Sequence, residues 1–212
     1  MPYPEQPLSK FLEDLASRTP TPGGGSTSAL VGALGLGLAS MAALYTTENE
    51  KFKAVEEQAR KLDASFSELR RLFVSGIEAD IQAYCAYSDA RKLPRATPDE
   101  KATRSKKIAE SNEAATQIPE KIIADARAGL RLVEELAGVV NPGLAGDVAA
   151  AAYFLEAAAR GAGIQVISNC ATDDKEGLNA TRRTRAEAEI AACQAARERI
   201  DVAVKRLIRP LV

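Results

Sequence analysis

The chain has 212 residues, of which 46% are hydrophobic and 27% are charged, and its formal net charge is −1. These values are ordinary for a globular protein, and we treat residues 1–212 as a single domain. A net charge this close to zero gives no overall attraction to nucleic acid or to an anionic membrane. The sequence contains no His, so the most common general base and metal ligand is absent. Any acid–base chemistry must therefore use other side chains or water.

The three cysteines, Cys85, Cys170 and Cys193, are far apart and form no CxxC pattern. Neither a disulfide framework nor a zinc site is expected from this spacing. Unpaired thiols are typical of a reducing cytoplasm, and residues 1–10 lack the basic flank and apolar stretch of a signal peptide. We therefore expect a cytoplasmic protein that holds no metal.

Helical periodicity dominates the chain, and no strand pattern of useful length occurs. A short amphipathic helix is expected over residues 7–17, followed by a turn segment, TPTPGGGS, at 19–26. The next run, 29–45, is almost wholly apolar and rich in Ala and Gly. Because it is at the short limit for a membrane span, we interpret it as a buried helix of a bundle. Its possible N-caps are Ser26, Thr27 and Ser28.

A long helix is expected over residues 52–89. Its apolar residues recur with heptad spacing, at Phe52, Val55, Ala59, Leu62, Phe66, Leu69 and Phe73. The continued stripe reaches Asp80, where an apolar residue is due. A buried carboxylate is costly unless it is paired, so Asp80 is either part of a structural ion pair or a carboxylate with a functional role. A helix this long requires a partner chain or several helices along it.

The second half of the chain predicts further helices. One begins at a capping box near residue 97, and Pro119 is expected to kink or restart it before it ends near residue 138. Asp147 opens a helix that ends near Asn169, because Asp at a helix start is favoured by capping and by the helix dipole. A polar loop at 172–175 precedes a last helix over 183–208.

The glycine-rich loop before the apolar helix offers free backbone N–H groups at a positive helix end. Such a loop can hold a carboxylate or a phosphate, although a simple tight turn explains the same spacing. It is neither a Walker loop nor a dinucleotide fingerprint, because the Lys-Ser/Thr pair and the strand are missing. Taken alone, Asp147 reads as an N-cap and Asn169 as a helix C-terminal residue, while Gln165 is an amide that needs a partner.

Together these features resemble the cyclodeaminase/cyclohydrolase family, which comprises the C-terminal part of formiminotransferase-cyclodeaminase and free-standing methenyltetrahydrofolate cyclohydrolases. The resemblance spans nearly the whole chain and keeps the order of the motifs. The residues that carry it are PTPGGGS at 20–26 with VGALG at 31–35, Asp80, Ala83 and Tyr84 with LPR at 93–95, Pro119 and Ile122, Asp147 and Val148, and Val166 and Asn169.

The resemblance implies an all-α, up-and-down bundle of long helices that forms a homodimer and binds a tetrahydrofolate derivative, with no cofactor beyond that substrate. One implied reaction is the opening of 5,10-methenyl-tetrahydrofolate by water to 10-formyl-tetrahydrofolate. We favour it because this activity is common as a separate bacterial protein. The alternative reaction closes 5-formimino-tetrahydrofolate with loss of ammonia. A non-catalytic dimer that binds a folate, another pterin or a protein partner is the remaining alternative.

The resemblance also implies the site residues. Both reactions need a carboxylate beside an amidinium-like cation and a group that moves a proton, and Asp80 and Asp147 are the candidates. The candidate substrate-binding residues are Gly23, Gly24, Gly25, Ser26, Gln82, Gln165 and Asn169. The sequence departs from the family pattern at Glu48, Asn49, Gln82, Gly146 and Gln165. These departures lie within the motifs and favour the non-catalytic alternative.

Overall fold

A computed structural model describes residues 1–170 and 177–208, and every regular element within these ranges is a helix. This confirms the predicted all-α class, while the loop expected at 172–175 lies outside the described residues. The body consists of α2 (Gly24–Leu44), α3 (Glu56–Lys92), α4 (Pro98–Ala137), α5 (Ala145–Asn169) and α6 (Leu178–Ile208). The shorter elements are α1 (Leu8–Leu15) and the 3₁₀ turns η1 (Tyr3–Glu5), η2 (Glu50–Val55) and η3 (Pro142–Leu144).

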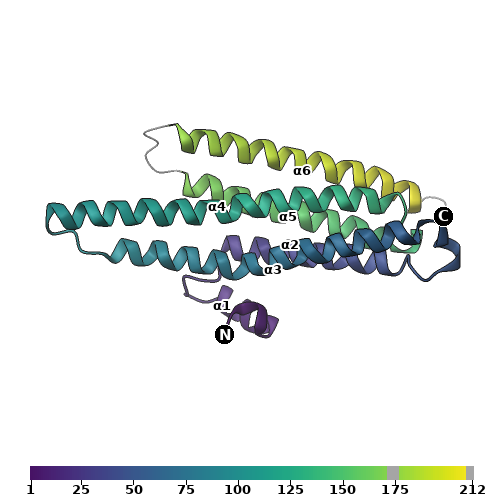
Figure 1. Cartoon of the computed structure of the whole chain (residues 1–212), viewed down its shortest axis with the longest axis horizontal. Coiled ribbons are helices and arrows are strands. Elements are labelled where there is room, and N and C mark those ends of the chain that lie inside the picture. The colour runs from purple at the N-terminus through teal and green to yellow at the C-terminus, as the bar shows by residue number, and fades with distance from the viewer. Residues whose placement is uncertain (171–176, 209–212) are drawn as a thin grey trace.

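The long helices lie side by side along the length of the molecule (Figure 1). Helix α2 packs against α3 and α5, and α4 packs against the same two helices from the other side. These four helices therefore surround one core, and α6 covers the groove between α4 and α5. The N-terminal α1 lies outside this bundle, beside α3 (Figure 1).

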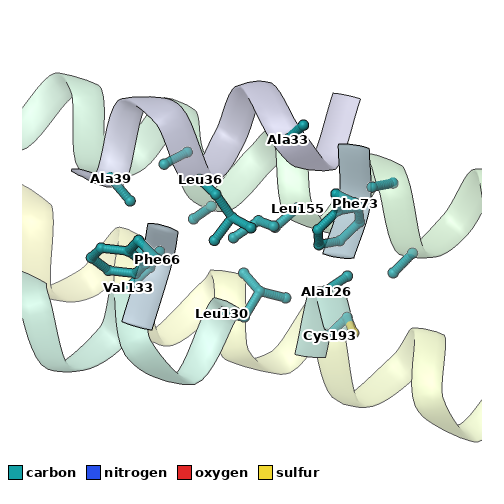
Figure 2. Packing of buried hydrophobic residues seen from close by; sticks show 14 of the residues in the cluster. Ala33, Leu36, Ala39, Phe66, Phe73, Ala126, Leu130, Val133, Leu155 and Cys193 are labelled. Carbon is teal, nitrogen blue, oxygen red and sulfur yellow. The ribbon is translucent and has the colours of Figure 1, made fainter. Parts of the chain in front are cut away.

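The core is built from the apolar stripes of all five long helices. Figure 2 shows Leu36 of α2 and Leu155 of α5 facing Leu130 of α4, with aromatic rings from α3 on either side. The heptad stripe of α3 supplies those rings, and its buried members include Leu62, Phe66 and Phe73. The predicted inward face of the long helix is thereby confirmed, although it starts at Glu56 because Phe52 and Val55 belong to η2.

Helix α2 is long and apolar enough to cross a membrane, but 56% of its most hydropathic window is buried inside the bundle. Its small residues let neighbouring helices approach closely. A Cβ on Gly32, for example, would lie 2.2 Å from a ring atom of Phe73. The helix begins at Gly24 with Gly23 as N-cap, so the prediction of Ser26, Thr27 or Ser28 as N-cap was wrong.

Helix α4 runs without interruption through Pro119. The expectation that this proline restarts the helix was wrong, because packing on both sides outweighs the local cost of proline. The Thr97 capping box is confirmed, since Thr97 Oγ1 accepts from Glu100 N and Glu100 Oε2 accepts from Thr97 N. Helix α6 begins at Leu178, five residues before the predicted start.

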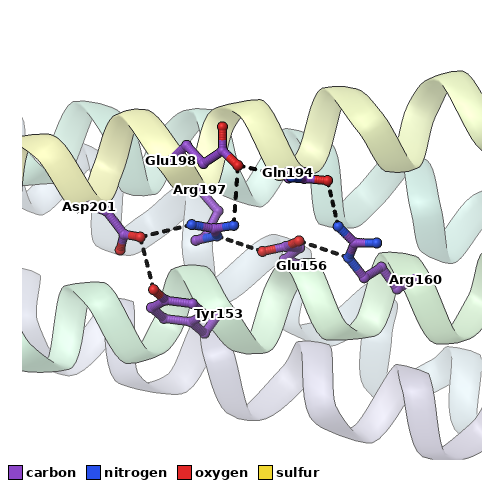
Figure 3. Close-up of polar contacts among 7 residues, drawn as sticks. All are labelled: Tyr153, Glu156, Arg160, Gln194, Arg197, Glu198 and Asp201. Atoms are coloured by element: carbon purple, nitrogen blue, oxygen red, sulfur yellow. Dashed lines mark hydrogen bonds and ion pairs between the residues drawn. The ribbon is translucent and has the colours of Figure 1, made fainter.

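A chain of polar side chains fastens α6 to α5 (Figure 3). Glu156 is buried and accepts from Arg160 Nε at 2.8 Å and from Arg197 Nε at 2.6 Å. Arg197 also pairs with Asp201 at 2.9 Å, and Tyr153 donates its hydroxyl proton to the same carboxylate. Because every charge in this cluster has a partner, it serves to dock one helix on another.

Candidate functional site

A cleft of about 320 Å³ opens at the N-terminal end of α2. The loop before α2 forms one wall, and side chains from α3, α4 and the last turns of α5 form the others. This volume is at the lower end of the range that small-molecule sites occupy. The side chains that shape its chemistry are Asp80, Tyr84, Tyr87, Asn112, Gln165 and Asn169.

Asp80 caps helix α2 from the neighbouring helix. The N-cap residue of α2, Gly23, has no side chain that could accept a hydrogen bond from the first turn. Asp80 Oδ2 accepts from the backbone N–H of Ser26 at 2.7 Å instead, while Ser26 Oγ accepts from Gly23 N at 2.9 Å. The carboxylate thus sits at the positive end of the α2 dipole.

Gly25 makes this arrangement possible. A Cβ at that position would lie 2.0 Å from Asp80 Oδ1 and 2.6 Å from its Cγ, distances that real atoms do not tolerate. Gly24, which also lines the cleft, lies against the end of the Gln165 side chain. A Cβ added at Gly24 would lie 2.5 Å from Gln165 Nε2. The close approach of the Asp80 carboxylate therefore requires glycine at position 25, and a simple turn does not explain this residue.

The electrostatics of Asp80 are set by burial. Removal from water raises the pKa of its carboxyl group above the usual value, and hydrogen bonding with Ser26 opposes this rise only in part. Among the described residues that line the cleft there is no Lys or Arg. The carboxylate consequently lacks a cationic partner within the cleft, and a bound cation would supply one.

Two asparagines join α4 to the end of α5 at the floor of the cleft. Asn112 Nδ2 donates to the backbone carbonyl of Asn169 at 3.3 Å. Asn169 Nδ2 donates to the backbone carbonyl of Ala115 at 3.2 Å. The nitrogen of each amide is used for a backbone contact, so each Oδ1 remains as an acceptor.

Two tyrosines on α3 were not predicted to line the site. Asp80, Tyr84 and Tyr87 follow one another at i, i+4 and i+7, so they share one face of the helix. Tyr84 is 43% exposed, and the guanidinium of Arg91, one turn further, lies 5.9 Å from the centre of the Tyr87 ring. Along this face of α3, the half-buried Asp80 carboxylate is therefore followed by two aromatic rings and then by the exposed guanidinium of Arg91. The i, i+4, i+7 spacing from Asp80 is the sequence signal for these two tyrosines.

The structure brings most of the predicted site residues together. Six of them line the cleft, namely Gly23, Gly24, Gly25, Asp80, Gln165 and Asn169, and Ser26 lies buried directly beneath it. Gln82 does not line the cleft; its side chain is exposed and donates to Glu78 Oε1 at 3.2 Å.

Asp147 also lies apart from the cleft within one chain. It occupies the first turn of α5, whereas Gln165 is near the last; 18 residues of helix separate them by about 27 Å. The N-cap of α5 is Leu144, so the prediction that Asp147 opens this helix was wrong by three residues. Asp80 and Asp147 of a single chain do not act on the same atom.

Most departures from the family pattern lie at this second end of the bundle. Asn141 N donates to Thr46 Oγ1 at 3.0 Å, which brings the start of α5 beside the end of α2. Glu48, Asn49 and Gly146 therefore lie near that junction, and Gln165 alone of the five departures lines the cleft. Within one chain, the three residues at the junction and Gln82 therefore lie apart from the cleft.

Comparisons with known proteins agree with this fold. The family model described as formiminotransferase-cyclodeaminase matches residues 7–188. The chain is 33% identical over 198 residues to methenyltetrahydrofolate cyclohydrolase of Methylorubrum extorquens, a match that covers 93% of this chain and 95% of that protein. It is 32% identical over 193 residues to formimidoyltransferase-cyclodeaminase of Sus scrofa, covering 90% of this chain but 36% of that longer protein.

Among solved structures, the fold is similar to that of formiminotetrahydrofolate cyclodeaminase from Thermotoga maritima. The TM-score is 0.84 at 22% sequence identity, and the match covers 96% of this chain and 98% of that one. A likeness at this identity shows the fold, and the sequence matches show the family. The chain belongs to the formiminotransferase-cyclodeaminase family.

Proposed function

We propose that this protein is a methenyltetrahydrofolate cyclohydrolase, which opens 5,10-methenyl-tetrahydrofolate with water to give 10-formyl-tetrahydrofolate. The observation that carries the proposal is the Asp80 carboxylate, which is half-buried and lacks a cation among the residues that line its cleft. The 33% identical relative of nearly equal length bears the name of this activity.

The substrate supplies the missing cation. Its methenyl carbon is bonded to two nitrogens, N5 and N10, that share a positive charge. A carboxylate held beside this group in a partly dry cleft attracts it more strongly than a carboxylate in water does. Because Ser26 and Gly25 fix Asp80 in advance, little reorganisation is needed when the substrate arrives.

The same carboxylate is suited to moving the proton. In the first step the oxygen of a water molecule bonds to the methenyl carbon, and Asp80 takes one of the water protons, which gives a neutral carbinolamine. In the second step the bond from this carbon to N5 breaks, N5 takes the proton from Asp80, and the hydroxyl proton leaves to solvent as the formyl C=O forms. The raised pKa of Asp80 makes it a better base than an exposed carboxylate.

The shape of the cleft suggests how the folate lies. The pterin ring presents several N–H donors, which the Oδ1 atoms of Asn112 and Asn169 can accept. The aminobenzoyl ring then meets Tyr84 and Tyr87, and the negatively charged glutamate tail reaches Arg91 at the exposed end of this face.

The test is loss of the near-ultraviolet absorbance of 5,10-methenyl-tetrahydrofolate, measured with purified protein against the spontaneous rate. Asp80→Asn keeps an oxygen for the Ser26 N–H but removes the base, so we expect its turnover to fall by at least about 10²-fold. Asp89→Asn is the matched control, because this carboxylate lies on the same helix and pairs with Lys92 outside the cleft. Wild-type turnover in both variants would contradict the mechanism.

Formimidoyltetrahydrofolate cyclodeaminase activity is the second candidate, favoured by the 32% identical relatives with that name. This reaction also passes through a tetrahedral carbon between two nitrogens and needs the same carboxylate. Release of ammonia from 5-formimino-tetrahydrofolate, with no hydrolysis of the methenyl compound, would select it. Binding of tetrahydrofolate without either turnover would select the non-catalytic alternative.

We also propose that the protein is a homodimer joined through the outer face of α2. Leu34 and Leu44 on this face are each 50% exposed, and Val74 and Phe154 border a shallow apolar groove beside it. Such an exposed apolar surface is typical of an interface. A shared role for Asp147 and Asp80 requires this second copy, since the two residues lie at opposite ends of the helical bundle within one chain.

Two measurements test the dimer. Light scattering should give twice the chain mass, and Leu34→Asp should reduce it to that of the monomer. If Asp147 completes the partner's site, a mixture of the inactive variants Asp80→Asn and Asp147→Asn should regain activity through mixed dimers. A wild-type monomer would contradict the interface, and full activity of Asp147→Asn alone would remove that residue from the site.

A further inference from the structure

Pro119 lies inside α4 and is buried. Proline has no backbone N–H, so the carbonyl four residues earlier lacks its usual donor within the helix. That carbonyl belongs to Ala115, which lines the cleft. The proline thus frees a backbone acceptor at the edge of the site.

The freed carbonyl is used by Asn169. Its Nδ2 donates to Ala115 O at 3.2 Å, while its own backbone carbonyl, at the end of α5, accepts from Asn112 Nδ2. A carbonyl oxygen accepts and cannot donate, so the atom of Asn169 that faces Ala115 must be the nitrogen. One N–H of the amide is used in this contact, which fixes the orientation of the group and leaves Oδ1 as its acceptor.

We propose that Pro119 is a positioning residue, which acts through the Ala115 carbonyl to hold Asn169 with its Oδ1 ready to accept from an N–H group of the substrate. This rests on the proposed binding of a folate, whose pterin ring carries such donors. A residue with an N–H at position 119 would donate to Ala115 O itself and compete with Asn169 Nδ2 for this acceptor. The amide of Asn169 would then be held less firmly, and its nitrogen could turn toward the substrate.

The first test needs no substrate. In Pro119→Ala the side-chain NH₂ of Asn169, followed by ¹H–¹⁵N NMR of the full chain, should lose the protection from exchange that a hydrogen-bonded amide has. Pro98→Ala is the matched control, because Pro98 begins the same helix and its replacement leaves Ala115 unchanged. An Asn169 signal that is the same in the wild type and in Pro119→Ala would overturn the proposal.

The second test measures binding. Pro119→Ala should raise KM for 5,10-methenyl-tetrahydrofolate, or Kd for tetrahydrofolate if turnover is absent, by about two- to tenfold, the value of one neutral hydrogen bond. The kcat should change little. In an Asn169→Ala background the same change should have no further effect, since two residues that act through one contact are not additive. Equal effects in both backgrounds would overturn the proposal.

The two measurements separate this inference from the proposed function. If the Asn169 signal changes but the wild type binds no folate, the proposed function fails and with it the substrate half of the inference. If the wild type binds folate and Pro119→Ala changes neither the signal nor the affinity, the proposed function stands and the inference is wrong.

Discussion

Replacement of Gly25 by Ala perturbs the site at its tightest contact. The added Cβ would lie 2.0 Å from Asp80 Oδ1, whereas non-bonded carbon and oxygen need more than about 3 Å. The neighbouring atom belongs to a carboxylate that is itself fixed by Ser26, so Asp80 must move by about 1 Å or more. The hydrogen bond from the Ser26 N–H to the carboxylate is lost in the process.

The expected magnitudes follow from that movement. Loss of the hydrogen bond that caps α2 lowers the free energy of unfolding by about 2 kcal/mol. Ala in place of Gly within a helix raises it by about 0.5–1 kcal/mol. The free energy of unfolding should therefore fall by about 1 kcal/mol. The effect on kcat should be larger, because a misplacement of about 1 Å can cost about 10²-fold in rate.

The neighbouring glycines provide graded controls. A Cβ on Gly23 meets nothing within 4 Å, and a Cβ on Gly24 meets the end of the flexible Gln165 side chain. Urea denaturation and methenyl-tetrahydrofolate turnover should therefore rank the variants as Gly23→Ala, Gly24→Ala and Gly25→Ala, from the mildest effect to the most severe. Turnover of Gly25→Ala equal to that of Gly23→Ala would refute the assignment of Asp80.

Three further outcomes are expected. Because burial raises the folded-state pKa of Asp80, its contribution to stability is present below the unfolded value of about 3.9 and is lost as pH rises through the folded value. As pH rises between these two pKa values, the free energy of unfolding of the wild type should thus fall relative to that of Asp80→Asn. A difference between the two free energies that stays constant with pH would argue against a buried carboxyl. Glu156→Ala leaves Arg197 without a buried partner and should lower the free energy of unfolding by about 3 kcal/mol; KM should stay unchanged, and a raised KM would show that the α5–α6 cluster reaches the site. Tyr84→Ala should raise KM by about two- to tenfold through loss of ring stacking, whereas an unchanged KM would place the substrate elsewhere.

Much of the fold follows from periodicity. The heptad stripe of α3 identified its buried face, and the break in that stripe at Asp80 located the carboxylate that the structure places in the cleft. Local rules failed where tertiary contacts outweighed them. Helix α4 continues through Pro119 because neighbouring helices support it, and α2 is capped by a residue 54 positions away.

The site was predicted less completely for geometric reasons. The order of the motifs along the chain does not show how far apart Asp147 and Gln165 lie. The length of the helix that carries both residues places them at its opposite ends. Gln82 follows Asp80 by two residues, a spacing that places it on another side of the helix. Tyr84 and Tyr87 follow Asp80 on the same helical face, but periodicity alone does not show whether such rings line a cleft or pack in the core.

The most direct test of the account is single-turnover hydrolysis of 5,10-methenyl-tetrahydrofolate by wild type, Asp80→Asn and Asp89→Asn under identical conditions. We expect rapid loss of absorbance with wild type and Asp89→Asn, and a rate near the spontaneous one with Asp80→Asn, while all three show the same helical circular dichroism. Turnover by Asp80→Asn at the wild-type rate would contradict the central claim, namely that the carboxylate capping α2 also performs the chemistry.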